Sequence, residues 1–372
     1  MSRPKIVLLG KLPPPYMGPA IATQILLRSS LTDRYDVHHV DTNAHGSLDS
    51  IGTWSMEKVR TNLRIYAHLA RVLRDEKPDL VVIPISQATL GFIKDSVFVL
   101  LSWLAGRTTL IQLRGSNLQN WLASAPVPVR VYAEAVLRRA QGAIVLGNNL
   151  RHLFREYFRE DHIFVVPNGA NYDSVLGKSR SETVSTRRVR VLYLANLQPS
   201  KGIEDVIRAV DILTERGVTG FSLDVVGAWR DDATRDTCLN LVETHALPVS
   251  FHGPAYDADK FRFFAAADVF VFPPREPEGH PWVIVEALAS GLPIISTDQG
   301  AITESVVDGV NGFIVAPKRP DQIADRVARL IEHPTLRSQL ADASRQHYEA
   351  HFTEERMVEQ LSDAVEHMVQ PT

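Results

Sequence analysis

The sequence of 372 residues predicts an α/β protein with two doubly wound parallel-sheet domains. Three observations favour this fold class. Short apolar runs rich in β-branched residues alternate with longer helix-spaced patterns along nearly the whole chain. The runs are almost continuously apolar, which is typical of parallel strands that helices cover on both faces. The alternation is interrupted once, at the polar residues 171–188, and then resumes.

The first series predicts an N-terminal domain over residues 1–170. We expect strands at residues 6–9, 37–40, 80–83, 109–113, 143–146 and 163–166. We expect helices between them at residues 20–30, 56–75, 90–104, 129–139 and 149–158. The first apolar run ends in Gly and Pro and lacks a small-residue cleavage site, so it predicts a buried strand and not a signal peptide.

The second series predicts a C-terminal domain over residues 189–352, after a linker at residues 171–188. We expect its strands at residues 189–194, 222–226, 249–251, 268–272, 294–296 and 313–315. We expect its helices at residues 203–215, 230–245, 257–266, 282–290 and 321–332. A helical stretch follows at residues 336–369. The last part of the chain, residues 353–372, is expected to form a helix that packs back on the N-terminal domain.

The composition, with 45% apolar residues and no run of eighteen that could cross a membrane, is that of a soluble protein. The single cysteine, Cys238, excludes an internal disulfide and suits a structural thiol in a reducing cytosol. Residues 1–175 hold 20 Lys and Arg against 14 Asp and Glu, whereas the remainder holds 20 against 29. A basic half can dock on anionic lipid or another anion, and ordinary solvated helix faces are the alternative.

Residues 273–300, PPREPEGHPWVIVEALASGLPIISTDQG, are the stretch best suited to a ligand site. The preceding strand ends at two prolines, which force a loop, and Pro281 is expected as the first residue of the next helix. Ligands of open parallel sheets bind at the carboxyl ends of the strands. The loop therefore offers Glu278, Gly279 and unpaired helix N–H groups to a ligand.

Glu278 and Glu286 are expected to border one cleft at different depths, since a little over two helical turns separate them. An acid that only stabilises the helix N-terminus is the alternative for Glu278. A solvated helix residue is the alternative for Glu286. Its apolar neighbours instead suggest a buried helix, in which a carboxylate needs a partner.

Two further loops carry the residues of anion sites. In the first, GKLPPPYMGPA, Gly18 allows a backbone path that other residues resist, and a helix follows. In the second, VLYLANLQPSKGIEDVIRA, Lys201 precedes a helix, where an ammonium beside helix N–H groups suits a diphosphate. A solvated loop charge is the alternative for Lys201. No G-x-G-x-x-G follows a predicted strand and no P-loop motif occurs, which argues against a dinucleotide-binding protein and against a P-loop protein.

These pieces together resemble the large retaining glycosyltransferase family four, whose GT-B fold has two Rossmann-like domains facing across a cleft. The most specific part is EGHPWVIVEALASGLPIIST, which is similar to the E-x7-E region of that family. Supporting segments are VVPNGAN, SKGIEDVIRA and QGAITESVVDGVNGFIV. The resemblance covers nearly the whole chain in order.

The resemblance implies a retaining, metal-independent hexosyltransferase. Such an enzyme would move a sugar from a nucleotide-diphosphate sugar to a glycan or lipid-linked acceptor in cell-surface polysaccharide or glycolipid synthesis. Glu278 would orient the donor sugar, and Glu286 would bind the nucleotide ribose. Lys201 would neutralise the diphosphate, whose charge grows in the transition state.

The resemblance also implies contacts through the backbone. Gly18 would bring N–H groups of the first domain to the phosphates as the cleft closes. The sugar hydroxyls would meet backbone N–H groups in the segment formed by Gly279, His280, Pro281 and Trp282.

Three positions depart from the family pattern. Asn196 stands where an Arg usually precedes the Lys; it can hydrogen-bond a phosphate but brings no charge. Pro19 replaces the second Gly of the first loop, so one backbone donor is missing. Arg114 lies where the family often places a His. It is a candidate catalytic group for phosphate or sugar contact, with a buried structural Arg as the alternative.

We expect no metal and no cofactor beyond the donor itself. The D-x-D spacing at residues 257–259 opens a helix, where Asp is expected as a cap, and the thirteen His show no metal-binding spacing. The expected partners are the donor, the acceptor and an anionic membrane met through the N-terminal domain, with no nucleic acid. The expected location is cytoplasmic and peripheral at the inner membrane face. A nucleotide-sugar epimerase of the same fold and a non-catalytic nucleotide-sugar-binding subunit are the alternatives.

Overall fold

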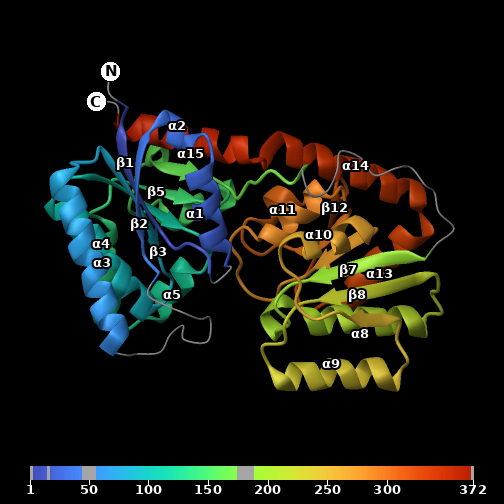
Figure 1. Cartoon of the computed structure of the whole chain (residues 1–372). Helices are drawn as coiled ribbons and strands as arrows, with labels where there is room; N and C mark the ends of the chain where they lie inside the picture. The colour runs from blue at the N-terminus through green and yellow to red at the C-terminus, as the bar shows by residue number, and fades with distance from the viewer. Residues whose placement is uncertain (1–2, 15–16, 44–55, 174–187, 370–372) are drawn as a thin grey trace. The chain divides into compact units, whose positions relative to one another are not determined.

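The computed structural model describes residues 3–14, 17–43, 56–173 and 188–369. The chain divides into two compact units, the first made of Met1–Ala170 with Glu354–Thr372 and the second of Asn171–Thr353. Each unit contains a six-stranded parallel sheet with helices along it (Figure 1). The prediction of two doubly wound parallel sheets is confirmed. Of the linker predicted at residues 171–188, residues 174–187 lie outside the described part of the chain.

The sheet of unit 1 has the strand order β2-β1-β3-β4-β5-β6. Its strands are β1 (Lys5–Gly10), β2 (Asp36–Asp41), β3 (Leu80–Ile85), β4 (Thr108–Leu113), β5 (Gly142–Val145) and β6 (Ile163–Val165). The helices are α1 (Gly18–Arg28), α2 (Leu31–Arg34), α3 (Met56–Asp75), α4 (Thr89–Leu104), α5 (Leu118–Ser124), α6 (Val127–Leu137) and α15 (Glu354–Val369), with 3₁₀ turns η2 (Asn148–Phe154) and η3 (Glu160–His162).

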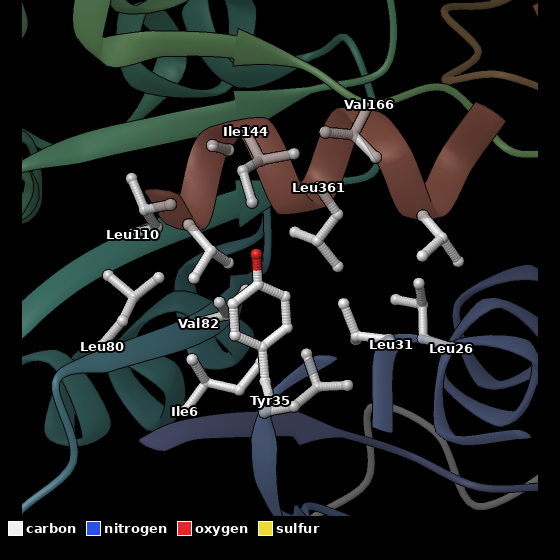
Figure 2. Packing of buried hydrophobic residues seen from close by; sticks show 14 of the residues in the cluster. Ile6, Leu26, Leu31, Tyr35, Leu80, Val82, Leu110, Ile144, Val166 and Leu361 are labelled. Carbon is white, nitrogen blue, oxygen red and sulfur yellow. The ribbon is translucent and has the colours of Figure 1, made fainter. Parts of the chain in front are cut away.

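The core of unit 1 joins its sheet to α15, the last helix of the chain. Leu361 packs among side chains from four parallel strands, including Ile6, Leu80 and Leu110 (Figure 2). The buried residues of α15 follow helical spacing and face the sheet as one apolar stripe; they are Met357, Val358, Leu361, Ala364 and Val365. The hydroxyl of Tyr35 donates to the backbone oxygen of Ser362 at 3.4 Å. The C-terminal helix is therefore part of the first unit.

The sheet of unit 2 has the order β12-β11-β10-β7-β8-β9. Its strands are β7 (Val189–Leu194), β8 (Phe221–Val226), β9 (Val249–Phe251), β10 (Val269–Phe272), β11 (Ile294–Thr297) and β12 (Gly312–Val315). Its helices are α8 (Ile203–Glu215), α9 (Asp232–Thr244), α10 (Asp257–Ala266), α11 (Trp282–Ala289), α12 (Ile302–Ser305), α13 (Pro320–Glu332) and α14 (Pro334–His351), with the 3₁₀ turn η4 (Pro199–Lys201).

The strand orders place one topological switch point in each sheet. In unit 2 the order reverses between β7 and β10, and in unit 1 between β1 and β3. Loops that leave the carboxyl ends of such neighbouring strands diverge to opposite faces of the sheet and leave room for a ligand. The loops after β7 and β10, and those after β1 and β3, are therefore the places to search for sites.

The predicted elements differ from the structure mainly where helices are short. Residues 149–158 were expected to form an α-helix, but the structure has the 3₁₀ turn η2, whose buried Leu150 and Leu153 are three residues apart, as that helix requires. The helical stretch at residues 336–369 is two helices, because the chain leaves helical geometry at the buried Phe352. The short α2, α5 and α12 were not predicted.

Candidate active site

Two loops of unit 2 meet at the switch point of its sheet. The loop after β7 carries Lys201 in the turn η4, and Gly202 follows it with a φ of 77°. A Cβ atom on Gly202 would collide with the backbone oxygen of Pro273, in the loop after β10. The backbone N–H of Arg275 donates to the oxygen of Ser200 at 2.9 Å. Glycine is therefore required at position 202 both by its φ and by the close approach of the two loops.

Arg275 fixes these loops to the first turn of α8. Its Nε and Nη2 atoms donate to the two carboxylate oxygens of Asp205, both at 2.7 Å, and its Nη1 donates to Glu204 at 3.1 Å. These hydrogen bonds raise the pKa of Arg275, so the charge is permanent. Asp205 is buried, and a buried carboxylate is stable only with such a partner. The sequence interpretation did not single out Arg275.

Lys201 and Glu278 form an ion pair across the two loops. The side chain of Lys201 is 24% exposed and that of Glu278 is 15% exposed, so a ligand can reach both. The hydroxyl of Tyr193, in β7, donates to the backbone oxygen of Lys201 at 3.0 Å, and this hydrogen bond fixes the turn before α8 to the sheet. The structure thus brings together one ammonium and one carboxylate that are 77 residues apart in the sequence.

The turn at Gly300 supports the backbone beside Glu278. Gly300 has a φ of 59°, and a Cβ atom there would lie 2.6 Å from the backbone oxygen of Gly279. The N–H of Ala301 donates to that same oxygen at 2.8 Å. Pro281 occupies the cap position before α11 and is not the first helical residue, which corrects the prediction by one position. Trp282 begins the helix and is buried.

His280 points into the core of unit 2. Its Nε2 lies 2.7 Å from the hydroxyl of Ser305, and its ring centroid lies 5.1 Å from that of Phe352. Burial lowers the pKa of His280 to about 3, so the imidazole is neutral at physiological pH. A role for His280 at a ligand would therefore be carried by its backbone.

Glu286 is 2% exposed, which excludes the solvated-helix alternative. Its Oε1 accepts from Nζ of Lys260 at 2.6 Å and from the hydroxyl of Tyr172 at 3.4 Å. Its Oε2 is buried and has no hydrogen-bond partner among the described residues. A buried carboxylate oxygen without a donor is costly, and a ligand hydroxyl would satisfy it. Neither partner of Oε1 was foreseen from the sequence.

Asn196 has an unforeseen neighbour, Arg230. The loop after β8 continues beside the loop after β7, with Trp229 bridged to Leu197. From there Nε of Arg230 donates to Oδ1 of Asn196 at 3.3 Å. The structure therefore places a guanidinium beside the position where family four usually has an Arg. The only sequence signal is an Arg soon after a strand end, which is too common to identify a site.

The remaining two predicted site residues lie in unit 1. Gly18 is the first residue of α1, directly after β1 and its loop. Arg114 follows β4 and donates from Nη1 to Oδ1 of Asn168 at 3.0 Å. Burial lowers the pKa of Arg114 to about 10, so it remains a cation at neutral pH. No carboxylate among the described residues pairs with it.

Among the described side chains, no group of metal-ligating residues is found at either switch point. Asp257 is the first residue of α10 with Tyr256 in the cap position, so the expected Asp cap is wrong. Asp259 accepts from Arg262 at 2.6 Å. In the described part of the chain, one group has metal-ligand atoms within 4.8 Å of one another. It lies in unit 1 at the opposite, amino end of β6 and consists of the exposed Asp161 and His367 and the half-buried His162.

A hollow with a volume of about 410 Å³ lies between α8 and α9, away from the candidate residues. Cys238 contributes to its wall and is buried. Burial raises the pKa of this thiol to about 12, so it is protonated at neutral pH and a poor nucleophile. We therefore place the candidate site at the loops and not in this hollow.

Comparison with known proteins gives matches of two kinds. Residues 178–347 match the family model described as Glycosyl transferases group 1. An uncharacterized glycosyltransferase of Methanocaldococcus jannaschii is 32% identical over 182 residues, 46% of this chain and 45% of that protein. A phosphatidyl-myo-inositol mannosyltransferase of Mycobacterium leprae is 28% identical over 203 residues, 54% of this chain and 53% of that protein. The chain thus spans about half the length of the curated relatives it matches.

Solved structures show the same fold over nearly the whole chain. A glycosyltransferase from Rickettsia africae superposes with a TM-score of 0.75 at 16% identity, covering 100% of both chains. The Anabaena protein HepE, in complex with UDP, superposes with a TM-score of 0.74 at 18% identity, covering 98% of this chain and 100% of that one.

Two doubly wound units of this kind define a protein of the GT-B fold class. Residues 178–347, which fall in the second unit, match the glycosyl transferases group 1 family, also called glycosyltransferase family four. The resemblance recognised in the sequence is confirmed.

Proposed function

We propose that the protein is a retaining glycosyltransferase. It moves a sugar from a nucleotide-diphosphate sugar to a glycan or lipid-linked acceptor. The observation that carries the proposal is the ion pair of Lys201 and Glu278, held where the strand order of unit 2 reverses. This is the expected place for a nucleotide in such a sheet.

The ion pair suggests a role for Lys201 and a role for Glu278. A donor diphosphate would replace Glu278 as the anionic partner of Lys201, and Glu278 would then accept hydrogen bonds from the sugar. The bond between the anomeric carbon and the diphosphate breaks, and its electron pair leaves with the nucleoside diphosphate. The acceptor oxygen bonds to that carbon from the same face, and its proton passes to the leaving diphosphate. Lys201 favours this step because negative charge grows on the leaving group.

Glu286 is assigned to the ribose of the donor. Its buried Oε2 lacks a donor among the described residues, and a ribose hydroxyl supplies one. Lys260 and Tyr172 occupy Oε1 and fix the direction of the carboxylate. The donor sugar is assigned to the backbone from Gly279 to Trp282.

The charge that a metal ion would supply is assigned to side chains. Lys201 and Arg230 place an ammonium and a guanidinium after the neighbouring strands β7 and β8. Arg230 compensates for Asn196, where the family usually has an Arg. We propose that the diphosphate is neutralised by these groups and that the reaction is metal-independent.

The acceptor side is assigned to the cytoplasmic face of a membrane. Nine of the twelve exposed large apolar side chains found among the described residues lie on the three helices α3, α4 and α6 of unit 1. Helix α4 packs against both α3 and α6. The guanidinium carbon of Arg139, just beyond α6, lies 4.7 Å from the ring centroid of Trp103 in α4. Arginines such as Arg60 and Arg64 are exposed on α3. Apolar and basic groups together suit an anionic lipid surface.

The membrane contact we propose is peripheral. Among the described residues, no helix is long and apolar enough to cross a membrane. The names of relatives include a capsular polysaccharide biosynthesis glycosyltransferase of Staphylococcus aureus and the mannosyltransferase above, which acts on phosphatidyl-myo-inositol by its name. We therefore propose a role in cell-surface polysaccharide or glycolipid synthesis.

Product analysis tests the proposal. The protein is incubated with UDP-, GDP- and ADP-sugars, with and without a candidate acceptor, and the anomeric configuration of products is determined by NMR. We expect transfer with retention, and a loss of about a hundredfold in turnover for Glu278→Gln. Glu276→Gln, two residues earlier and exposed, is the matched control and keeps wild-type turnover. Conversion of the donor without acceptor would instead identify an epimerase, and binding without turnover a non-catalytic subunit.

A further inference from the structure

The carboxyl edge of the sheet in unit 1 brings basic residues to its own switch point. β1 pairs with β3 in the register Ile6 to Leu80, so Lys11, directly after β1, lies beside the end of β3. Arg114 directly follows β4, whose Leu113 pairs with Ile85 at the end of β3. Adjacent strands are about 4.8 Å apart, and β3 lies between β1 and β4. The backbones of Lys11 and Arg114 therefore leave the sheet roughly 10 Å from each other.

Helix α4 adds Lys94 to this edge. A Cβ atom on Gly91 would lie 2.6 Å from the Cβ of Ser86, so the first turn of α4 touches the end of β3. Nζ of Lys94 lies 3.0 Å from Oδ1 of Asp95. Oδ2 of Asp95 accepts from the backbone N–H of Ser86 at 2.9 Å and from its hydroxyl at 2.5 Å. Asp95 is buried, and both of its oxygens are occupied.

The positive charges at this edge exceed what the nearby carboxylates pair. In the described part of the chain, the ammonium of Lys11 has no ion pair and no hydrogen-bond partner. The acids that face it are Asp95, already paired with Lys94, and Asp41, whose Oδ1 accepts from the N–H of Asn43 at 2.9 Å. Burial and the charge of Lys94 lower the pKa of Lys11.

Arg114 increases the imbalance, since it is partly buried and, among the described residues, donates a hydrogen bond only to the neutral side chain of Asn168. A fold gains nothing by keeping partly buried cations without anions, because each loses hydration that nothing replaces. A bound anion restores the balance, and a switch point is where a doubly wound sheet receives its ligand. The donor is already assigned to the corresponding point of unit 2.

We propose that Lys11, Lys94 and Arg114 form a subsite for a phosphate group of the acceptor. The acceptor class is then a phosphorylated sugar, polyol or lipid. The identification of the ligand as the acceptor rests on the proposed function. The anion site itself is argued only from the charges and the topology of unit 1. The diphosphate of the donor is the other source of a phosphate group for this site. The second experiment distinguishes a phosphate of the acceptor from the diphosphate of the donor.

The first experiment measures binding of inorganic phosphate to the full chain by calorimetry at low ionic strength. We expect saturable binding that Lys11→Met or Lys94→Met weakens at least about tenfold, as the loss of one charge contact predicts. Lys5→Met is the matched control, because Lys5 lies at the other end of β1 and pairs with the exposed Glu76. We expect this variant to bind phosphate as the wild type does. Absence of saturable binding, or equal affinity in all variants, overturns the proposal.

The second experiment compares donor and acceptor. With an acceptor carrying a phosphate, Lys11→Met raises the KM of that acceptor at least about tenfold and changes the affinity for the nucleotide sugar by less than twofold. Lys201→Met has the reverse effect. If Lys11→Met weakens nucleotide-sugar binding as much as Lys201→Met does, the anion is the diphosphate of the donor. The subsite assignment then fails while the proposed function stands. If phosphate binds at Lys11 but no nucleotide sugar binds anywhere, the proposed function fails and the anion site remains.

The third experiment separates binding from folding at Arg114. Because a cation without a carboxylate does not stabilise the fold, Arg114→Met is expected to melt at or above the wild-type Tm while losing phosphate affinity. A lowered Tm with unchanged phosphate affinity would make Arg114 a structural residue held by Asn168, and would remove it from the subsite.

Discussion

Arg275 holds the loop after β10 against the first turn of α8, so its removal should reduce both stability and turnover. In the substitution Arg275→Met, the carboxylate of Asp205 stays buried and loses two hydrogen bonds of 2.7 Å. Removing one partner of a buried ion pair costs about 3–5 kcal/mol. The side chain of Arg275 is 16% exposed, and solvent screening places the expected loss of unfolding free energy near the lower end, at about 3 kcal/mol.

Urea unfolding measures this loss as a shift of the midpoint at unchanged slope. Arg216→Met is the control, because Arg216 and Asp325 form an ion pair in the same unit with side chains 46% and 60% exposed. Exposed pairs contribute about 0–1 kcal/mol. The same loop carries Glu278, so a displacement of about 1 Å should also lower turnover by roughly a hundredfold. If Arg275→Met unfolds at the same urea concentration as Arg216→Met, Arg275 does not hold the loops and the reasoning is wrong.

Three further predictions concern the same unit. Arg230→Met should weaken nucleoside diphosphate binding about tenfold by calorimetry, whereas Arg235→Met, in an exposed ion pair on α9, should not; equal effects would exclude Arg230 from the site. Glu286→Gln should weaken nucleoside binding about tenfold without lowering Tm, and an unchanged affinity would contradict the ribose assignment. Lys260→Met should lower Tm, because it leaves the buried carboxylate of Glu286 unpaired. The folded-state pKa of His280, about 3, lies below its unfolded value, so its contribution to stability is complete above pH 6.5 and is lost as pH falls from 6.5 towards 3. His280→Phe should therefore reduce the slope of unfolding free energy against pH in that window by about 1.4 kcal/mol per unit, and equal slopes would show that His280 is not buried as a neutral group.

The sheets were predictable because most of their strands are apolar on both faces, the edge strands β2 and β9 being the exceptions. All twelve strands of the described chain appear where the pattern predicts them, with ends shifted by at most two residues. β7 and β9 have the predicted bounds. A central strand such as β7 can be recognised without knowing its neighbours, because burial on both faces makes nearly all of its residues apolar. Short helices such as α12 carry too few residues to show a period.

The candidate residues were predictable where a local motif marks them. Lys201 stands before a helix and Glu278 after a strand and two prolines, so the loop chemistry of each is visible in its own segment. Their direct ion pair was not predictable, because it depends on which strands are neighbours. β7 and β10 pair in the sheet although a β-strand order cannot be read from either segment.

The supporting residues were not predictable for the same reason. Arg275, Arg230 and Lys260 act through contacts 26 to 71 residues away in the chain, and nothing in their own neighbours marks them. Lys11 was part of a recognised loop but was not singled out. Its significance comes from a missing partner, and only the three-dimensional surroundings show that the nearby Asp95 is already paired with Lys94.

The ammonium of Lys201 is the group on which the donor site depends, and isothermal calorimetry of the full chain tests it most directly. The titration uses the nucleotide sugar that best stabilises the wild-type protein in a thermal-shift screen of UDP-, GDP- and ADP-sugars. We expect one binding site per chain, with an affinity reduced at least about tenfold in Lys201→Met and unchanged in Glu276→Gln. Equal affinities of wild type and Lys201→Met, or no binding of any nucleotide sugar by the folded wild type, would contradict the account.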